Sequence, residues 1–283
     1  MRQLIADSGS SKTDWRIINE DGSIQQLKTK GINPYLIPGN ELLDSLKNEL
    51  SEIVKIEFDI IHFYGAGCGQ SKNKAKIKSV LNSIFKNSKV LVEDDMLAAA
   101  RASCLNQLGI VCILGTGANA CFYDGKSITQ KMISLGYALG DEGSGNYIGK
   151  MILKAYLENE LSEKLQTAFK NTFPEVTLEN ALENIYQKPY ANRYFAQFFE
   201  FVLLHQKEKY CFELMTDAFQ QFLEKSVLKF DHHQEYPIHF VGSVAFHANS
   251  IMRMVLNKNH LTAGNFMESP IAGLTLYHKN QNS

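Results

Sequence analysis

The sequence lacks several features that mark common classes of protein. Its 283 residues contain no CxxC pair, no run of 18 apolar residues and no G-x-x-x-x-G-K-[ST] motif. These absences argue against a cysteine-based metal site, a membrane-spanning helix and a P-loop. The formal net charge is -1, so no basic field recruits nucleic acid or an anionic membrane. We therefore expect neither as a partner.

Cysteine is scarce, and its count is odd. An odd number without paired spacing fits reduced, packed thiols in a cytoplasmic protein better than a disulfide framework. The apolar run at the amino terminus is too short for a secretory signal. We expect a cytoplasmic chain whose five cysteines pack in the interior: Cys68, Cys104, Cys112, Cys121 and Cys211.

Hydrophobic residues make up 45% of the chain, enough for a sizeable core in one large or two medium domains. The first third predicts a meander of strands at 3–6, 14–19 and 23–28, then helices at about 40–54 and 73–85 that alternate with further strands. Strands joined through helices predict parallel pairing in the later part of this sheet.

The pattern restarts at Gly109. The stretch GIVCILGTGANACFYDG predicts two strands around a glycine-rich tip, and SITQKMISL predicts a third. This echo of the opening meander indicates an internal repeat. From Gly143 the chain is mostly helical, with aromatic stripes at helical spacing that we assign to the core, and SPIAGLTLYHK predicts a closing helix.

Four polar or glycine-rich turns follow apolar strands: DSGSSKTD, EDD, GTGAN and VGSV. Small residues let phosphate oxygens approach the backbone, and successive amides that point one way form an anion-binding concavity. A single turn of this kind also fits a plain tight turn. Four of them together indicate a phosphate site.

Acidic residues stand at two of the strand ends. Asp7 could approach a magnesium ion, which usually takes one or two protein carboxylates plus phosphate oxygens, or it could close a local turn. Among Glu93, Asp94 and Asp95, at least one is expected to cap the following helix. Asp95 is our candidate for the base that accepts a proton from an attacking hydroxyl.

The stretch SLGYALGDEGSGNYIGK places Asp141 and Glu142 in a glycine-rich loop before a helix. Carboxylates accept hydrogen bonds from paired hydroxyls, so this loop suits a polyol ligand. Acidic capping of the helix is the alternative.

In chain order, DSGSSKTDW, EDDMLAAA, GTGANA, GDEGS and FVGSVAF resemble the phosphate-1, connect-1, phosphate-2, sugar-loop and adenosine segments of the N-acetylglucosamine kinase-like ATPases. This family belongs to the actin, hexokinase and Hsp70 superfamily. The resemblance implies an α/β fold with two ribonuclease-H-like domains flanking a cleft and closing over Mg-ATP. The domains would be 1–108 and 109–283, with a helical insertion at about 143–232 and a last helix packing back on the first domain.

The resemblance also implies residue roles. Asp95 matches the catalytic base, and Asp7 would lie near the Mg²⁺. Sugar contacts would come from Asn33, Asn119, Gly136 and Asp141. ATP would contact Gly9, Ser10, Ser11, Lys12, Thr13, Gly115, Thr116, Gly117, Gly242 and Ser243.

We therefore expect an ATP-dependent kinase that transfers the γ-phosphate to a hydroxyl of an amino sugar, with the 6-hydroxyl of N-acetylglucosamine as first choice. The stretch SLGYALGDEGS lacks the fuller Gly-aromatic-Gly run of the animal enzymes, so the contacts to the N-acetyl group are not placed. Two alternatives stay open: an activator-type ATPase of a 2-hydroxyacyl-CoA dehydratase-like system, and a non-catalytic sensor of amino sugar or nucleotide. Aromatic helices after Tyr190 could supply a homodimer face.

Overall fold

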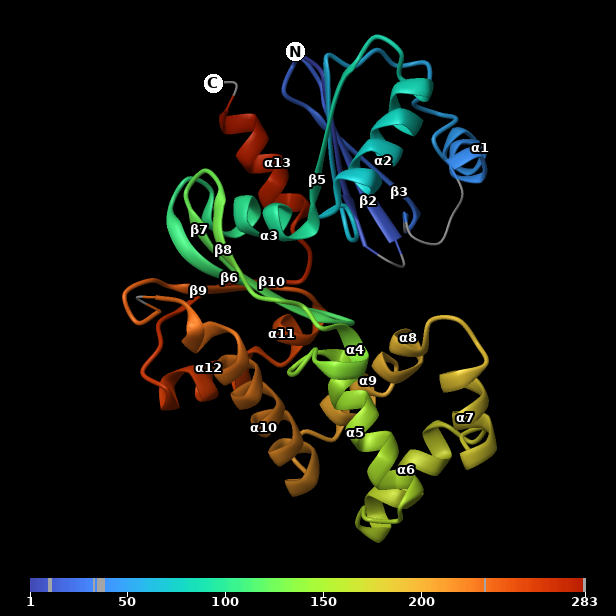
Figure 1. The fold of residues 1–283 in the computed structure, drawn as a ribbon, viewed down its shortest axis with the longest axis vertical. Coiled ribbons are helices and arrows are strands. Elements are labelled where there is room, and N and C mark those ends of the chain that lie inside the picture. The colour runs from blue at the N-terminus through green and yellow to red at the C-terminus, as the bar shows by residue number, and fades with distance from the viewer. Residues whose placement is uncertain (10–11, 33, 35–38, 232, 282–283) are drawn as a thin grey trace. The chain divides into compact units, whose positions relative to one another are not determined.

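The computed structural model describes residues 1–9, 12–32, 34, 39–231 and 233–281. The chain divides into two compact units (Figure 1). The first comprises Met1–Gln107, Gly125–Ser127 and Pro270–Ser283, and the second comprises Leu108–Asp124 and Ile128–Ser269. Each unit contains one five-stranded mixed sheet. The predicted α/β class is confirmed.

The sheet of the first unit has the strand order β3-β2-β1-β4-β5. Its first three strands form an antiparallel meander, and β1, β4 and β5 run parallel. Both pairings agree with the sequence prediction, because the meander strands are joined by short turns and the later ones by helices. The strand bounds are β1 Gln3–Ser8, β2 Lys12–Ile18, β3 Ile24–Lys30, β4 Ile60–Gly65 and β5 Lys89–Asp94.

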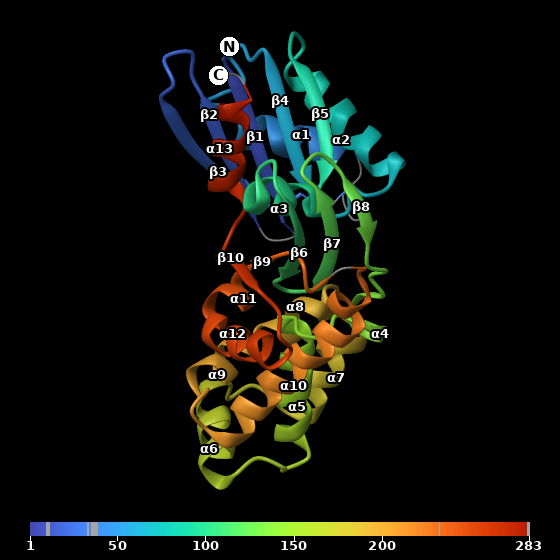
Figure 2. The same ribbon diagram turned by 90° about the vertical axis from the view of Figure 1, so that its left-hand side faces the viewer.

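Helices cover both faces of this first sheet (Figure 2). Helices α1 (Gly39–Glu49) and α2 (Ser71–Ile84) pack on the face that carries Leu4 and Phe63. Helices α3 (Asp95–Cys104) and α13 (Ile271–Asn280) contact each other and pack against β1. A Cβ added at Gly273 of α13 would lie 2.5 Å from the carbonyl oxygen of Ala102. The two helices therefore cross closely.

The second sheet repeats this topology. Its order is β10-β9-β6-β7-β8, with an antiparallel meander of β6, β7 and β8 and with β6, β9 and β10 parallel. The predicted internal repeat is thus confirmed at the level of topology. The strands are β6 Leu108–Leu114, β7 Ala118–Asp124, β8 Ile128–Lys131, β9 Ile238–Val241 and β10 Ala263–Met267.

Two predicted elements are shorter in the structure. The first helix ends at Glu49 rather than near residue 54, because the amides of Ser51 and Ile53 bond to carbonyls three residues back and tighten the chain into turns. The third strand of the second meander ends at Lys131 rather than residue 135. Gly136 then adopts a φ of 69° and begins the four-residue helix α4 (Gly136–Leu139).

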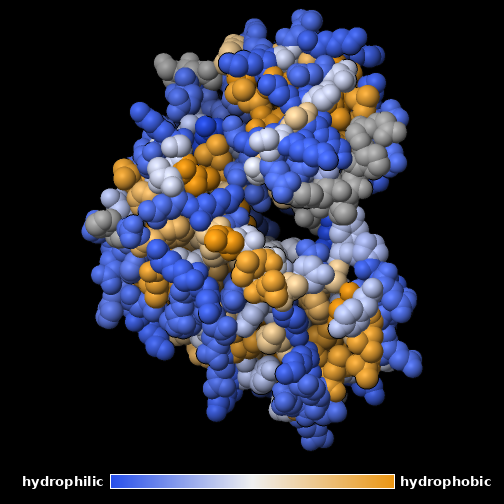
Figure 3. Space-filling view, viewed as in Figure 1, coloured by the Kyte–Doolittle hydropathy of each residue, from blue (hydrophilic) through white to orange (hydrophobic). Residues whose placement is uncertain are grey.

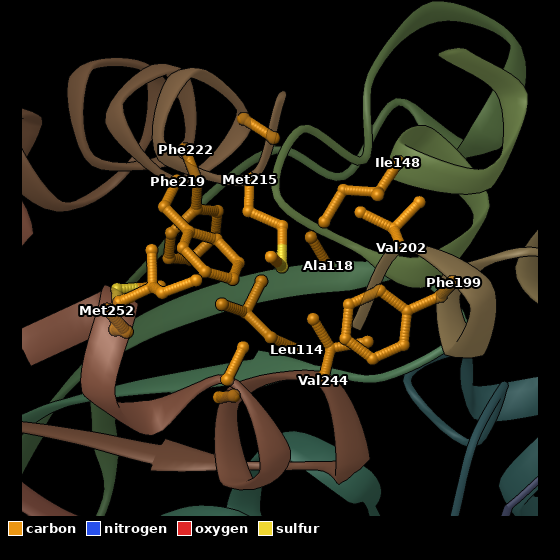
Figure 4. Packing of buried hydrophobic residues seen from close by; sticks show 14 of the residues in the cluster. Leu114, Ala118, Ile148, Phe199, Val202, Met215, Phe219, Phe222, Val244 and Met252 are labelled. Atoms are coloured by element: carbon orange, nitrogen blue, oxygen red, sulfur yellow. The ribbon is translucent and has the colours of Figure 1, made fainter. Parts of the chain in front are cut away.

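The rest of the second unit is helical from Gly145 to the last β-strands, as predicted. Figure 4 shows its core, in which Leu114 of β6 lies among Phe219, Phe222 and Met252. Most aromatic residues of these stripes are therefore core residues. The helices are α5 Gly145–Leu157, α6 Glu163–Thr172, α7 Leu178–Tyr186, α8 Ala191–Ala196, α9 Phe199–Leu204, α10 Lys209–Lys225, the 3₁₀ helix Val227–Lys229, α11 Ser243–His247 and α12 Asn249–Lys258.

Hydrophilic side chains cover most of the face seen in Figure 3, and smaller apolar patches interrupt them. The exposed large apolar residues include Ile133, Leu135 and Leu139, which lie in or just before α4. Within the described part of the chain, no helix is both long enough and apolar enough to cross a bilayer.

Candidate functional site

In the first unit, two acidic residues lie at the same edge of the sheet. Strands β1, β4 and β5 are parallel and in register, with Ser8 opposite Gly65 and Gly65 opposite Asp94. Asp7 lies one residue before the end of β1, and Asp95 directly follows the end of β5. The sequence predicted that both acids lie at or next to the end of a strand, and the structure places them there.

The hairpin between β1 and β2 is closed by backbone and hydroxyl hydrogen bonds. The amide of Gly9 donates to the carbonyl of Lys12 at 2.9 Å. The hydroxyls of Ser8 and Thr13 share a hydrogen bond of 2.8 Å, and Thr13 donates to the carbonyl of Lys30 at 3.0 Å. Because Thr13 is fully buried, its side chain holds the hairpin together. Its predicted contact with phosphate would have to come from the backbone.

Two predicted ATP-binding residues at this hairpin tip, Ser10 and Ser11, lie outside the described residues, as does the predicted sugar contact Asn33. Asp14 was not among the predicted site residues. It is 4% exposed and lies opposite Asp7 in the hairpin, with Lys12 Nζ 3.2 Å from its carboxylate. The signal for it was present in the quoted motif DSGSSKTDW, whose last acid is Asp14.

The three acids at the end of β5 have separate positions. Asp94 is the N-cap of α3 and accepts a hydrogen bond from the amide of Leu97 at 2.9 Å, as predicted for at least one of them. Glu93 accepts from Lys74. Asp95 is the first residue of α3 and is half-buried. The helix cap is therefore supplied by its neighbour and does not require Asp95.

Cys68 lies in the turn that follows β4, and its side chain is fully buried. Burial, and then the negative charge of nearby Asp95, raise the pKa of the Cys68 thiol to about 12. Burial likewise raises the pKa of Cys104 to about 11 and that of Cys211 to about 12. These thiols stay protonated at neutral pH, and all five cysteines are buried.

In the second unit, the turn between β6 and β7 lies against the end of β9. The turn closes through the amide of Gly115, which donates to the carbonyl of Gly117 at 3.1 Å. Gly242 follows β9 with a φ of 122°. A Cβ added there would lie 2.3 Å from the carbonyl oxygen of Leu114. Glycine is required here, and Ser243, which begins α11, follows it directly.

The loop that carries Asp141 is attached to this same turn. Asp141 adopts a φ of 62°, and its Oδ1 accepts a hydrogen bond from the amide of Ala118 at 3.3 Å. The amide of Gly145 donates to the carbonyl of Gly115 at 2.8 Å. The predicted sugar loop and the predicted phosphate turn thus form one hydrogen-bonded structure within the second unit.

Asn146, which was not among the predicted site residues, also bonds to this turn and to the Asp141 loop. Its Nδ2 donates to the carbonyl of Thr116 at 2.5 Å and to Oδ2 of Asp141 at 2.8 Å. No motif spacing pointed to it, because its partners lie 30 and 5 residues away. Asn119, which was predicted, uses its Oδ1 to accept from the amide of Ala120. Gly136 lies in open space.

A cavity of about 260 Å³ in the first unit lies apart from these residues. Its lining includes His62, Tyr64 and Arg101, and none of the predicted site residues. We assign the candidate site from the strand ends and turns, because the groups that could bind phosphate and hydroxyls gather there.

Asp7 could approach a magnesium ion carried by a nucleotide. Within the described ranges, no three His, Cys, Asp or Glu side chains come together as a metal site. Mg²⁺ needs only one or two protein carboxylates when phosphate oxygens supply further ligands. Asp7, at the end of a strand and beside a phosphate-type turn, meets that requirement.

The fold and these motifs define a nucleotide-using class of protein. A model of the BadF/BadG/BcrA/BcrD ATPase family matches residues 6–275. The chain belongs to this family, and the family predicted from the sequence is confirmed.

Individual relatives are sugar kinases by name. The chain is 27% identical over 162 residues to an N-acetylmuramic acid/N-acetylglucosamine kinase of Clostridium acetobutylicum. This match covers 54% of the chain and 52% of that protein, so it spans about half the length of the relative.

Two solved structures are similar over nearly the whole chain. One is a protein of Porphyromonas gingivalis named as a candidate N-acetylglucosamine kinase, with a TM-score of 0.93, 37% identity and 99% coverage of both chains. The other, from Chromobacterium violaceum and named in the same way, has a TM-score of 0.71, 17% identity and 98% coverage of both chains. The second likeness shows the fold alone. The predicted class of enzyme, a sugar kinase, is the class named for the Clostridium relative and for the Porphyromonas protein.

Proposed function

We propose that this protein is an ATP-dependent amino-sugar kinase that phosphorylates a hydroxyl of N-acetylglucosamine or a close relative, with the 6-hydroxyl as the first choice. The observation that carries the proposal is the direct attachment of the Asp141 loop to the Gly115–Gly117 turn. A loop suited to hydroxyls and a turn suited to phosphates are held together by hydrogen bonds from Gly145 and Asn146.

Each unit supplies backbone groups that are candidates for phosphate binding. In the first unit, Gly9, Lys12 and Thr13 of the β1–β2 hairpin contact the phosphates, together with Ser10 and Ser11 on the sequence resemblance. In the second unit, Gly115, Thr116 and Gly117 do so, and Gly242 and Ser243 contact the adenosine. The glycines and serines among these positions let the backbone approach an anion closely. Mg²⁺ held near Asp7 would supply charge neutralisation for the phosphates.

Asp95 acts as the general base. Phosphoryl transfer depends mainly on positioning and on electrostatic stabilisation, so the acid has to orient the attacking hydroxyl and accept its proton. Asp141, Asn119, Gly136 and, on the resemblance, Asn33 hold the sugar. Each oxygen of the Asp141 carboxylate already accepts one hydrogen bond, from Ala118 or from Asn146. Its remaining lone pairs accept hydrogen bonds from sugar hydroxyls.

The activator alternative receives less support from the cysteines. An iron–sulfur cluster is held by cysteine thiolates. All five cysteines here are buried, so none of them lies at the surface of its unit. The sensor alternative does not require an acid at position 95. A cytoplasmic location and a homodimer remain predictions.

A coupled ADP-release assay with purified protein tests the proposal. N-acetylglucosamine, N-acetylmuramic acid, glucosamine and glucose are compared as acceptors at saturating Mg-ATP. We expect ADP release to require an amino sugar, and ³¹P–¹H NMR of the product to show phosphate on the 6-oxygen. Sugar-independent ATP hydrolysis would favour the activator. A ligand-induced rise in melting temperature without turnover would favour the sensor.

A further inference from the structure

Asn146 is fully enclosed at the start of α5. It is 1% exposed. Ser144, two residues earlier, caps the helix by accepting a hydrogen bond from the amide of Tyr147. The side-chain amide of Asn146 donates both to the carbonyl of Thr116 and to the carboxylate of Asp141. Its backbone amide also donates to the carbonyl of Thr116, at 3.1 Å. One residue therefore connects the nucleotide turn to the sugar loop.

The orientation of this side chain is fixed by its partners. Both neighbours of Nδ2 are oxygens that can only accept, so the flipped amide would bring Oδ1 against a carbonyl and a carboxylate. The actual Oδ1 is buried without a hydrogen-bond partner within the described part of the chain. A buried polar atom without a partner is unfavourable. The position is therefore better suited to holding two loops than to stabilising the helix.

We infer that Asn146 is a positioning residue that couples sugar binding at Asp141 to nucleotide binding at Thr116. This inference rests on the proposed function. The amide holds Oδ2 of Asp141, while the amide of Ala118 holds Oδ1, so the carboxylate presents its remaining lone pairs in fixed directions. When a phosphate group orders the Thr116 turn, the same amide orders the Asp141 carboxylate, and each ligand strengthens the other's binding.

The test variant is Asn146→Ala, which removes both donated hydrogen bonds. Asn146→Leu removes the same donors while keeping the branched shape of the side chain, and it replaces the alanine variant if that one does not fold. The matched control is Asn259→Ala. Asn259 also donates two side-chain hydrogen bonds, to Oε1 of Gln220 at 2.7 Å and to the carbonyl of Val255 at 2.8 Å. It lies at the end of α12 and has no part in the site.

Isothermal titration calorimetry measures the affinity for N-acetylglucosamine with and without a non-hydrolysable Mg-ATP analogue. We expect the analogue to tighten sugar binding at least fivefold in the wild-type protein and in Asn259→Ala. In Asn146→Ala the analogue should change the sugar affinity by less than twofold. In the ADP-release assay, the KM of this variant should be raised for both substrates. A wild-type factor near one, or an unchanged factor in Asn146→Ala, would overturn the inference.

Failure of the proposed function gives a different pattern. If the wild-type protein binds no amino sugar, the kinase proposal fails, and the analogue alone then tests Asn146. We expect Asn146→Ala to bind the analogue at least threefold more weakly than Asn259→Ala at a similar melting temperature. Equal affinity in the two variants would overturn the role of Asn146.

Discussion

At the scale of single residues, Gly242 shows how a backbone position constrains the site. Its φ of 122° and ψ of 154° lie in a region that is essentially restricted to glycine. The position of a Cβ would also overlap with the carbonyl group of Leu114, at 2.3 Å from the oxygen and 2.7 Å from the carbon. The carboxyl ends of β6 and β9 meet at this close approach.

We expect Gly242→Ala to lower the free energy of unfolding by about 2–4 kcal/mol, from backbone strain and overpacking together. Gly136→Ala is the matched control, since Gly136 also has a positive φ of 69° but no atom within 4 Å of an added Cβ. The control should lose only about 1 kcal/mol. Urea unfolding of both variants measures the difference, and equal losses would contradict the steric argument.

The sequence indicated where the candidate residues lie along the strands and turns better than it indicated their contacts. Strand-end acids and glycine turns were visible because each follows an apolar run. Three contacts depend on neighbours in the folded chain. The side chain of Thr13 bonds within the hairpin, Asp94 rather than its two acidic neighbours caps α3, and Asn146 bridges two loops. Asn146 meets Thr116 across 30 residues of chain. A single sequence does not reveal such pairs.

At the scale of elements, α13 is attached to the first sheet by a buried aromatic and polar cluster. His278 of α13 stacks on His62 of β4, with ring centroids 3.8 Å apart. Nε2 of His278 and the hydroxyl of Tyr64 share a hydrogen bond of 2.9 Å, and Arg101 of α3 donates to that hydroxyl at 2.7 Å. Burial, followed by the charges of Arg101 and Lys89, lowers the pKa of His62 to about 4.

The pKa of His278 is lowered to about 3, first by burial and then by His62 and Arg101. In the unfolded chain both rings titrate near 6.5. Below that pH the unfolded chain binds protons that the folded chain does not. The contribution to stability is therefore fully present above pH 6.5 and is lost as the pH falls toward 4.

We predict that the free energy of unfolding falls by up to about 2.7 kcal/mol per pH unit from these two histidines, in the middle of this window at about pH 5, where both rings are protonated in the unfolded chain and neither is in the folded chain. In His278→Gln, which keeps a hydrogen-bonding side chain but cannot be protonated, this slope should be smaller by about 1.4 kcal/mol per pH unit. Urea unfolding at several values between pH 4.5 and 7.5 measures both slopes. Identical slopes in the two proteins would show that His278 does not titrate on unfolding.

Element ends were less predictable than element types. The α1 prediction extended past Glu49 because Leu50 and Ile53 continue the apolar pattern, and both are buried. They reach the core from turns. The strand prediction past Lys131 followed apolar alternation at Ile133 and Leu135, but these side chains are exposed. Hydrophobic spacing indicates which residues are apolar, whereas backbone hydrogen bonds decide where an element ends.

At the scale of the whole molecule, each of the two units has a sheet of the same topology and a set of proposed site residues. The first unit contains Asp7, Gly9, Lys12, Thr13 and Asp95, and the second contains Gly115, Thr116, Gly117, Asn119, Gly136, Asp141, Gly242 and Ser243. The repeat was recognisable from the sequence because each half begins with a meander around a glycine-rich tip.

Asp95→Asn tests most directly whether Asp95 orients and deprotonates the sugar hydroxyl. The control is Asp94→Asn, the same change one residue away, in which asparagine still caps α3 because it is as good an N-cap as aspartate. The measured quantity is kcat for ADP release with N-acetylglucosamine. Nucleotide and sugar affinities are measured alongside by calorimetry.

We predict that kcat falls by ~10²- to 10⁴-fold in Asp95→Asn, because the amide cannot accept the proton. Both ligands should still bind within threefold of the wild-type affinity, and Asp94→Asn should keep at least half of the wild-type kcat. A kcat for Asp95→Asn within threefold of the wild-type value would contradict the account.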